Sequence, residues 1–245
     1  GARFDDRATG KLDALAPNAA VIHLDVDPAE LGKLRRPTVG VAGDIRIALT
    51  DLTMELDIEP WRRKCRELSE THAWSPPSGQ QHIDAPSLLR QLSERADENT
   101  IFACDVGQHQ MWVAQHVALN NPQRHLTSGG LGSMGFGLPA AMGAALANPG
   151  SPVVCVTGDG SLMMNIQELA TLRRYNIPVR IVLFDNTALG MVRQWQELFF
   201  QNRESEVDLS DNPDFAQVAE AFGIPSMSID RADQIDLAVD HIVSD

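Results

Sequence analysis

Short apolar runs rich in β-branched residues alternate along this chain with segments that repeat apolar residues at helical spacing. The apolar runs, most of which end at glycine or acidic residues, lie at residues 19–27, 39–45, 100–105, 153–161 and 179–184. Continuous apolar runs of this length are typical of buried parallel strands, and the segments between them predict covering helices. The pattern therefore predicts an α/β fold built on parallel sheets.

The apolar spacing also places the helices. A helix behind the run at 153–161 is predicted by four apolar residues at helical spacing, which are Leu162, Ile166, Leu169 and Leu172. The same reasoning predicts helices at 87–96, from Gly107, at 214–222 and from Ala232 onward. It also predicts one short strand at 226–229.

A change in composition divides the chain. Residues 61–81 turn polar and contain Pro76, Pro77 and Gly79, a composition typical of a helix followed by an interdomain linker. The sequence therefore predicts three parts: residues 1–60, the helix and linker at 61–81, and a domain at 82–245.

Composition and charge restrict the class of protein. The 245 residues are 43% hydrophobic, which is enough for a globular α/β protein of one large domain or one and a half ordinary ones. A formal net charge of −13 argues against nucleic acid or an anionic membrane as partner. No apolar stretch is long enough to span a membrane, and no signal peptide is recognisable.

The cysteines and the chain ends add two expectations. Cys65, Cys104 and Cys155 are far apart, and the last two lie in apolar runs, so we expect buried free thiols in a reducing cytosol. The chain begins without an initiator methionine and ends inside an amphipathic pattern. We therefore expect a fragment of a longer cytoplasmic subunit.

Polar side chains follow two of the predicted strands. Asp159 lies in Gly158-Asp159-Gly160 directly after one run, and Asn186 follows the run at 179–184. Ligands of open α/β sheets bind at the carboxyl ends of the strands, and Mg²⁺ prefers carboxylate and carboxamide oxygens beside a phosphate. Gly160 and Ser161 open a helix whose N–H groups favour an anion. The sequence thus predicts a metal and diphosphate site, although a simple turn with Asp159 as helix N-cap stays open.

These residues carry a family resemblance. Gly158-Asp159-Gly160 followed by Asn186 resembles the thiamine diphosphate motif, and 158–161 with 165–171 is similar to catalytic subunits of acetohydroxyacid (acetolactate) synthases. The resemblance runs from Gly1 to about Pro225 and is greatest to the bacterial isozyme II type of large subunit. That family often has Asn-Asn where this chain has Asp185-Asn186, a change that we expect to be harmless because the second residue is the metal ligand.

The resemblance implies an identity for each part. Residues 1–60 would be the C-terminal part of a Rossmann-like central domain that binds FAD, and residues 82–245 a parallel-sheet thiamine diphosphate domain truncated at its C-terminus. The FAD contacts would be Gly1, Ala2, Arg3, Phe4, Asp5, Asp25, Val26, Asp44 and Ile45. Without the resemblance, these residues read as surface turns with a solvated Arg/Asp cluster.

The resemblance also assigns the cofactor site. It implies that Mg²⁺ is bound by Asp159, Asn186 and the carbonyl of Ala188, that Met134 props thiamine diphosphate into a bent form, and that Trp195 and Met191 select the substrate. It gives catalytic roles to Gln108, Met134, Met191 and Trp195. The cofactor contacts would be Gln108, His109, Gly129, Gly132, Ser133, Met134, Asp159, Gly160, Ser161, Asn186, Leu189, Gly190 and Met191.

Each of these assignments has a plainer alternative. Gln108 and His109 can be a polar cap at a helix start, Met134 can fill a gap, and Trp195 can be the core residue of an amphipathic helix, although core burial is more assured for Phe199 and Phe222. Gly130, Gly132 and Gly135 match the G-x-G-x-x-G dinucleotide fingerprint. The segment before them, residues 124–129, is short and polar, so thiamine diphosphate is favoured over a nicotinamide cofactor.

The implied activity is decarboxylation of pyruvate on thiamine diphosphate and transfer of the two-carbon unit to pyruvate or 2-oxobutyrate, in branched-chain amino acid synthesis. A homodimer of catalytic subunits, a small regulatory subunit and FAD as a structural cofactor are implied with it. The alternatives are another thiamine diphosphate carboligase or pyruvate oxidase, a nicotinamide dehydrogenase, and an inactive cofactor-binding fragment. We expect the 245 residues alone to be inactive, because the family's proton-transferring glutamate lies on an N-terminal domain.

Overall fold

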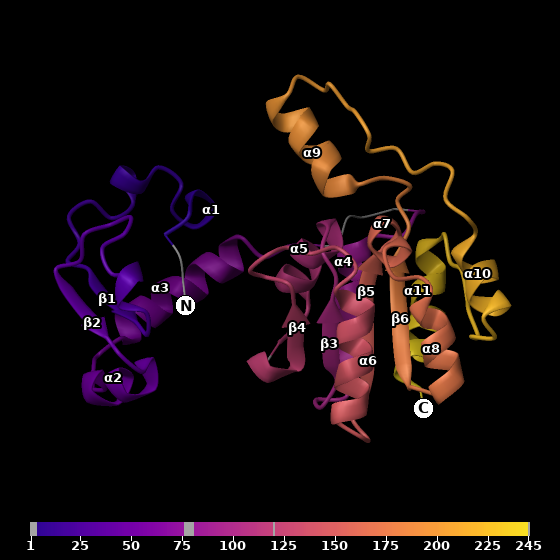
Figure 1. Cartoon of the computed structure of the whole chain (residues 1–245), viewed down its shortest axis with the longest axis horizontal. Coiled ribbons are helices and arrows are strands. Elements are labelled where there is room, and N and C mark those ends of the chain that lie inside the picture. The colour runs from indigo at the N-terminus through magenta and orange to yellow at the C-terminus, as the bar shows by residue number, and fades with distance from the viewer. Residues whose placement is uncertain (1–3, 76–80, 120, 245) are drawn as a thin grey trace. The chain divides into compact units, whose positions relative to one another are not determined.

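The computed structural model describes residues 4–75, 81–119 and 121–244 (Figure 1). The chain divides into two compact units, Gly1–Trp74 and Ser75–Asp245, and each is described by itself. The division falls inside the segment 61–81. The expected FAD contacts at Gly1, Ala2 and Arg3 lie outside the described residues.

The first unit is a pair of parallel strands with short helices. Strands β1 (Ile22–Asp25) and β2 (Val39–Ala42) pair with Ile22 opposite Val39. Around them lie the α-helices and 3₁₀ turns of this unit: α1 (Asp6–Thr9), η1 (Leu12–Ala14), η2 (Pro28–Glu30), α2 (Ile45–Leu52) and α3 (Glu59–Thr71). Both strands were predicted, and the parallel pairing confirms the α/β class for this unit.

The first unit buries almost nothing. Among its described residues only Asp25 is buried, whereas Ile22 is 56% exposed and Val39 49% exposed. The prediction of a buried strand at 19–27 is therefore wrong in its burial, because two strands and the eight-residue helix α2 cannot cover both faces of a sheet. Cys65, expected to be buried, is exposed for a similar reason, since α3 has no buried residue.

The second unit is built on a four-stranded parallel sheet in the order β4-β3-β5-β6. Its strands are β3 (Ile101–Cys104), β4 (His125–Thr127), β5 (Val153–Gly158) and β6 (Val179–Phe184). Helices or 3₁₀ turns precede, join and follow these strands: α4 (Ala85–Arg95), α5 (Gln108–His116), η3 (Pro122–Arg124), α6 (Gly137–Ala147), α7 (Asp159–Met163), α8 (Glu168–Tyr175), α9 (Gly190–Phe199), α10 (Phe215–Ala221), η4 (Ala232–Gln234) and α11 (Ile235–Val243). The predicted parallel α/β fold is confirmed.

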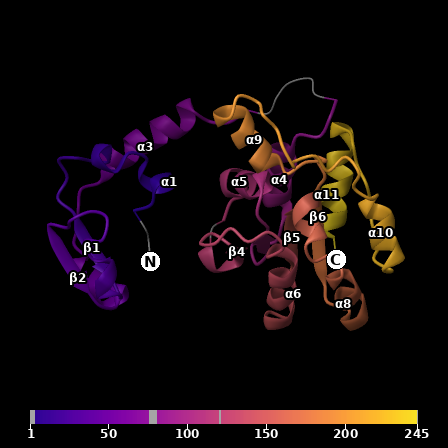
Figure 2. The same cartoon turned by 45° about the horizontal axis from the view of Figure 1, so that its top comes forward.

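The core of the second unit lies on both faces of this sheet. Along β3, Ile101 and Ala103 join the cluster packed against α6 and α8, while Phe102 and Cys104 join the cluster that includes α4, α5 and α11. Figure 2 shows these two groups of helices on opposite sides of the strands. Because side chains alternate along a strand, a fully apolar strand supplies both clusters. Cys104 and Cys155 are buried free thiols, as predicted.

Two predicted elements are corrected. The single helix expected at 162–172 is two helices, α7 and α8, separated by a turn in which Asn165 Nδ2 donates to the carbonyl of Gly135 at 2.5 Å. Leu162, Leu169 and Leu172 are nevertheless buried in one cluster, so the apolar stripe was predicted correctly and the break was not. The strand predicted at 226–229 is absent; Ser226 Oγ instead donates to the carbonyl of Ala216 on α10.

In the part of the chain that the structure describes, no helix combines the length and apolarity needed to cross a membrane.

Candidate functional site

Three strands of the second unit deliver acidic or amide side chains to one edge of the sheet. Asp105 directly follows β3, Asp159 directly follows β5, and Asp185 directly follows β6. The register pairs Cys104 with Val156 and Gly158 with Phe184, so these ends lie side by side, with α7 at the end of β5 (Figure 1). The prediction that β5 and β6 are neighbours is confirmed.

Asp159 is the most enclosed acidic group of this edge after Asp105. Its side chain is 3% exposed, Oδ1 accepts the N–H of Gly160 at 2.9 Å, and Oδ2 accepts Nδ2 of Asn212 at 3.0 Å. Asn212 Nδ2 also lies 3.5 Å from Oδ1 of Asp185. Burial raises the pKa of the Asp159 carboxyl, and the neighbouring Asp185 carboxylate raises it further. Sequence reasoning missed Asn212, which no strand-end pattern indicates.

The segment after β6 is held by hydrogen bonds to residues 207–209 and to Gln108. Asn186 Oδ1 accepts the N–H of Ala188 at 3.2 Å, and its Nδ2 donates to Gln108 Oε1 at 3.3 Å. On the other side, the N–H of Leu189 donates to the carbonyl of Val207, and the N–H of Leu209 to that of Thr187, each at 2.9 Å. Ala188 is consequently 4% exposed, and its carbonyl accepts no backbone hydrogen bond from the described residues.

Gln108 and His109 open helix α5 at the same edge. Gln108 links Asn186 to α9, because its Nε2 donates to Gln194 Oε1 at 3.3 Å. His109 is 5% exposed and its Nε2 has no hydrogen-bond partner. Burial lowers the pKa of His109 to about 4, so its imidazole is neutral at pH 7. An added Cβ on Gly107 or Gly158 would lie within 3 Å of the His109 ring, so both glycines are needed for its placement.

Several further predicted residues meet at the first turn of α7. A Cβ on Gly160 would lie 2.7 Å from Leu189 Cδ2 and 3.3 Å from Met134 Cε, so Met134 and Leu189 both pack close to this turn. A Cβ on Gly190 would overlap Oε1 of Gln108. Ser161 Oγ donates to the carbonyl of Val106 at 2.8 Å, which commits this hydroxyl proton to the backbone.

Other predicted residues lie apart from this cluster. Gly129, Gly132 and Ser133 belong to an exposed loop after β4, where the N–H of Ser133 donates to Oγ of Ser128 at 3.0 Å and Gly132 has φ +66°. No hydrogen bond among the described residues joins them to Asp159. The loop follows a three-residue edge strand, not the long buried strand that precedes a dinucleotide fingerprint.

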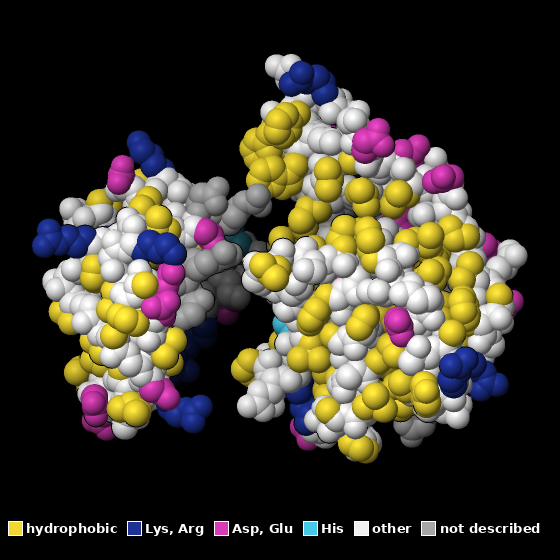
Figure 3. All heavy atoms as spheres, in the orientation of Figure 1, with side chains coloured by type: hydrophobic (Ala, Val, Ile, Leu, Met, Phe, Trp, Pro, Cys, Tyr) yellow, Lys and Arg dark blue, Asp and Glu magenta, His cyan; other side chains and the backbone are white. Residues whose placement is uncertain are grey.

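Trp195 lies on α9, a helix without a buried residue. Its indole is 38% exposed and packs against Phe199 with 5.1 Å between the ring centroids. Trp195 is therefore not a core residue, and the expectation that Phe199 is buried is wrong, since Phe199 is 65% exposed. Figure 3 shows hydrophobic side chains gathered on this helix.

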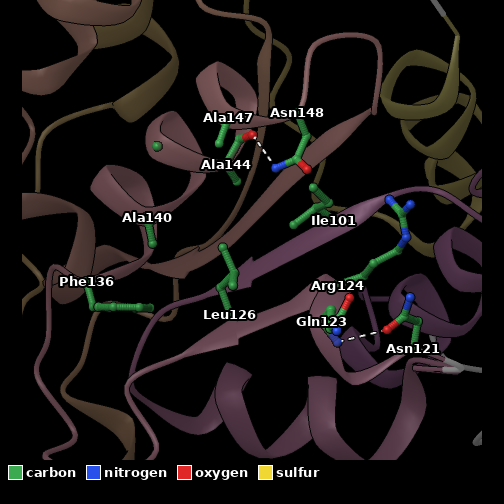
Figure 4. Close-up of a pocket in the computed structure, with 11 residues that line it drawn as sticks. Ile101, Asn121, Gln123, Arg124, Leu126, Phe136, Ala140, Ala144, Ala147 and Asn148 are labelled. Carbon is green, nitrogen blue, oxygen red and sulfur yellow. Dashed lines mark hydrogen bonds between the residues drawn. The ribbon is translucent and has the colours of Figure 1, made fainter.

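A separate hollow of about 420 Å³ lies between β4 and α6 (Figure 4). Leu126, Phe136 and Ala140 line it together with Arg124 and Asn148. The Arg124 guanidinium donates to the backbone and side chain of Asn99, and Asn148 Nδ2 donates to the carbonyl of Ala144. None of the predicted site residues lines this hollow.

The expected FAD residues of the first unit serve local hydrogen bonds. Asp25 Oδ1 accepts the N–H of Asp27 at 2.9 Å, which lowers the pKa of Asp25, and Asp44 Oδ1 accepts the N–H of Arg46 at 2.7 Å as the N-cap of α2. Asp5 Oδ1 likewise accepts the N–H of Ala8. The remaining described members are Phe4, whose ring packs edge-on against His23, and Val26 and Ile45, which are 77% and 49% exposed.

Comparison with known proteins identifies the family of this chain. Residues 105–245 match the thiamine pyrophosphate enzyme C-terminal TPP binding domain, and residues 1–52 match the thiamine pyrophosphate enzyme central domain. The chain belongs to the thiamine pyrophosphate enzyme family.

The similar curated proteins have more specific names than this family. The acetolactate synthase isozyme 2 large subunit of Escherichia coli is 52% identical over 100% of this chain. The isozyme 1 large subunit of the same organism is 42% identical over 100% of the chain, and a probable acetolactate synthase large subunit of Methanocaldococcus jannaschii is 43% identical over 96%. The chain spans 44%, 44% and 42% of the lengths of these three relatives.

Proposed function

We propose that this chain carries the thiamine diphosphate and Mg²⁺ site of an acetolactate synthase catalytic subunit. The observation that supports this most directly is the buried Asp159 carboxylate beside Asp185 and Asn186, at the ends of adjacent parallel strands, in a chain 52% identical to such a subunit. The reaction would be decarboxylation of pyruvate and transfer of the two-carbon unit to pyruvate or 2-oxobutyrate.

The donor set suits Mg²⁺. Asp159 offers a carboxylate, Asn186 a carboxamide oxygen and Ala188 a backbone carbonyl, which are the hard oxygen ligands that this ion takes beside a phosphate. The carboxylates of Asp159 and Asp185 share one amide group of Asn212. Two neighbouring carboxylates repel each other, and a bound cation would remove that repulsion.

The surroundings leave one hydrogen-bonding atom for a ligand. The buried Nε2 of the neutral His109 has no partner, and an unpaired buried polar atom is costly unless a ligand or water donates a hydrogen bond to it. Gly158, Gly160 and Gly190 have no space for a side chain, because His109, Leu189 and Gln108 pack directly against their backbone. The net charge of −13 makes a metal ion more necessary for holding an anion here.

The roles of the other residues follow from their positions. When bound, thiamine diphosphate would supply a nucleophilic carbon for addition to the substrate carbonyl. Met134, beside the first turn of α7, would support the cofactor's bent form, and Gln108 would hold Asn186 and α9 in register. Met191, which is half-buried, and Trp195, four residues further along α9, would contact the 2-oxoacid and select between acceptors.

Further partners belong to the same proposal. FAD would bind the first unit at the ends of β1 and β2, as a structural cofactor. The similar proteins are named as large subunits, which supports a small regulatory subunit, and a homodimer of catalytic subunits completes the proposed assembly.

Calorimetry on the 245-residue chain tests the cofactor site. Asp159→Ala removes a direct metal ligand, so the Mg²⁺-dependent affinity for thiamine diphosphate should fall by more than about 100-fold, beyond the 10–100-fold typical of outer-shell changes. Asp211→Ala, an exposed aspartate of the segment that carries Asn212, is the matched control and should leave the affinity unchanged. Unchanged affinity in Asp159→Ala would contradict the assignment.

Activity is tested in a chimera in which this chain replaces the matching residues of the E. coli isozyme 2 subunit. The chimera should form acetolactate, and Asp159→Ala should abolish it. Trp195→Leu should lower the ratio of 2-oxobutyrate to pyruvate products while activity persists, because one methylene of discrimination is worth about 1–3 kcal/mol. A chimera that binds the cofactor yet makes no acetolactate would contradict the proposed reaction.

A further inference from the structure

Asp105, at the end of β3, is a buried carboxylate to which the proposed function assigns no role. It is 1% exposed, and its oxygens accept three backbone N–H groups. Oδ1 accepts those of Val106 at 2.8 Å and Gly135 at 2.9 Å, and Oδ2 accepts that of Gly137 at 3.0 Å. A buried carboxylate requires such donors, and charge-assisted hydrogen bonds are stronger than neutral ones.

These hydrogen bonds fix the turn that leads into α6. The N-cap of α6 is Phe136, which has no side-chain hydrogen bond to offer, so Asp105, directly after β3, satisfies the first N–H group of the helix, that of Gly137. A Cβ on Gly137 would lie 2.9 Å from Oδ2 and 3.0 Å from the backbone N of Asp105, so the contact requires glycine. On the far side of the turn, Asn165 holds the carbonyl of Gly135.

The turn carries Met134, and Asp105 also reaches His109. Met134 immediately precedes Gly135, and its Cε packs close to Gly160 at the first turn of α7. The ring of His109 hydrogen-bonds the backbone of Asp105, which leaves Nε2 as its unpaired nitrogen. One residue therefore holds two groups of the candidate site, which lie on separate segments.

We propose that Asp105 is a positioning residue of the cofactor site. Its carboxylate places Met134 through the N–H groups of Gly135 and Gly137, and its backbone holds the neutral ring of His109, whose Nε2 lone pair is left for a hydrogen-bond donor of the ligand. This inference rests on the proposed function for the identity of the ligand. The placement of Met134 by Asp105 is independent of any ligand. A displaced Met134 therefore distinguishes a positioning role of Asp105 from a role limited to capping α6.

Two variants disturb the same contact from opposite sides. Asp105→Asn keeps the shape but replaces one oxygen with an N–H₂ group, which cannot accept from a backbone N–H. Gly137→Ala leaves Asp105 intact and pushes a Cβ against it. Gly143→Ala is the matched control, because it lies on the same helix and its Cβ would meet nothing within 4 Å.

The first readout is the methyl NMR spectrum of the 245-residue chain labelled at its methionines. Met134→Leu identifies the Met134 signal, and Met142, buried in α6, reports on the core. In Asp105→Asn and Gly137→Ala the Met134 signal should shift while that of Met142 stays in place. Gly143→Ala should leave both signals unchanged.

The second readout is calorimetric affinity for thiamine diphosphate in the presence of Mg²⁺. It should fall by about 10–100-fold in both test variants, the range typical when the support of a ligand-contacting residue is lost. An unmoved Met134 signal in the folded variants, even with lowered thermal stability, would overturn the inference and leave Asp105 as a cap. If Asp105→Asn does not fold, Gly137→Ala decides alone. A wild-type chain that binds no cofactor overturns the proposed function, whereas the Met134 signal still tests Asp105.

Discussion

The two units carry the same local arrangement, in which aspartates follow two adjacent parallel strands. In the first unit Asp25 ends β1 and Asp44 follows β2; in the second, Asp159 follows β5 and Asp185 follows β6. Asp44 is exposed and caps its own helix, whereas Asp159 is buried and meets Asp185 through Asn212. Similar strand ends thus produce a helix cap in one unit and a candidate metal site in the other.

The difference comes from packing around the sheet. The strands of the second unit are covered on both faces, and this cover lets carboxylates be enclosed with their N–H partners. The first unit, among its described residues, has no buried apolar side chain. A strand-end aspartate therefore indicates a ligand site only where a complete core surrounds it, and four predictions test this contrast.

Thiol reactivity should separate the two units most widely. Burial raises the pKa of Cys104 to about 12, so at pH 8 on the order of one thiol in 10⁴ is ionised, and burial also raises the pKa of Cys155. Cys65 on α3 is exposed. Ellman's reagent should therefore modify one thiol per native chain at once, and three in denaturant. Immediate reaction of a second thiol would show that the core of the second unit is open.

Core substitutions should differ next. Leu89 is 0% exposed, so Leu89→Ala should lower the free energy of unfolding of the second unit by about 2–5 kcal/mol. Val41, on β2 of the first unit, is 37% exposed. Val41→Ala should therefore change the free energy of unfolding of the first unit by less than about 0.5 kcal/mol. Urea denaturation followed by circular dichroism measures both. Equal losses would mean that the first unit holds a core of its own.

The buried histidine should give the second unit a pH dependence that the first lacks. The pKa of His109 is about 4 in the folded chain and about 6.5 in the unfolded one. Between these values only the unfolded state binds the proton, so stability is complete above pH 6.5 and falls by about 3 kcal/mol as the pH drops toward 4. The Asp105 carboxylate, which faces the ring, opposes part of this shift.

Denaturation at a series of pH values checks this dependence. His109→Gln should remove about 3 kcal/mol of the loss between pH 6.5 and 4, whereas His72→Gln, an exposed histidine of the first unit, should leave the profile unchanged. A profile that is the same for all three proteins would show that His109 is protonated or solvated in the folded chain.

The sequence predicted the elements and the edge of the sheet because these depend on local patterns. Apolar runs located the strands, and Gly158-Asp159-Gly160 with Asn186 indicated the strand ends that β5 and β6 bring together. It could not predict the break between α7 and α8, which depends on Asn165 reaching Gly135, nor the exposure of the first unit. Apolar spacing is the same in a helix that continues and in one that is interrupted.

The partners of the site residues were also beyond the sequence. Asn212 approaches Asp159 from a distant segment and stands in no recognisable motif. Asp105 ends a predicted strand, but the pattern does not show that its carboxylate reaches Gly135 and Gly137. The orphaned Nε2 of His109 likewise follows from tertiary packing against Gly107 and Gly158. Long-range side-chain contacts of this kind require the folded structure.

The smallest expected effect concerns Asp185, which the sequence treated as a harmless replacement for asparagine. Because Asp185 lies beside Asp159, its charge should attract a bound divalent cation, by about 1–2 kcal/mol for an exposed group a few ångströms away. Asp185→Asn should weaken Mg²⁺ binding roughly tenfold, measured by calorimetry at saturating thiamine diphosphate. Asp44→Asn is the matched control, because asparagine caps a helix as well as aspartate does and Asp44 is not one of the proposed metal ligands. Unchanged Mg²⁺ affinity in Asp185→Asn would mean that aspartate is a harmless replacement for asparagine at this position. Stronger binding would mean that repulsion between the two carboxylates outweighs their attraction for the metal.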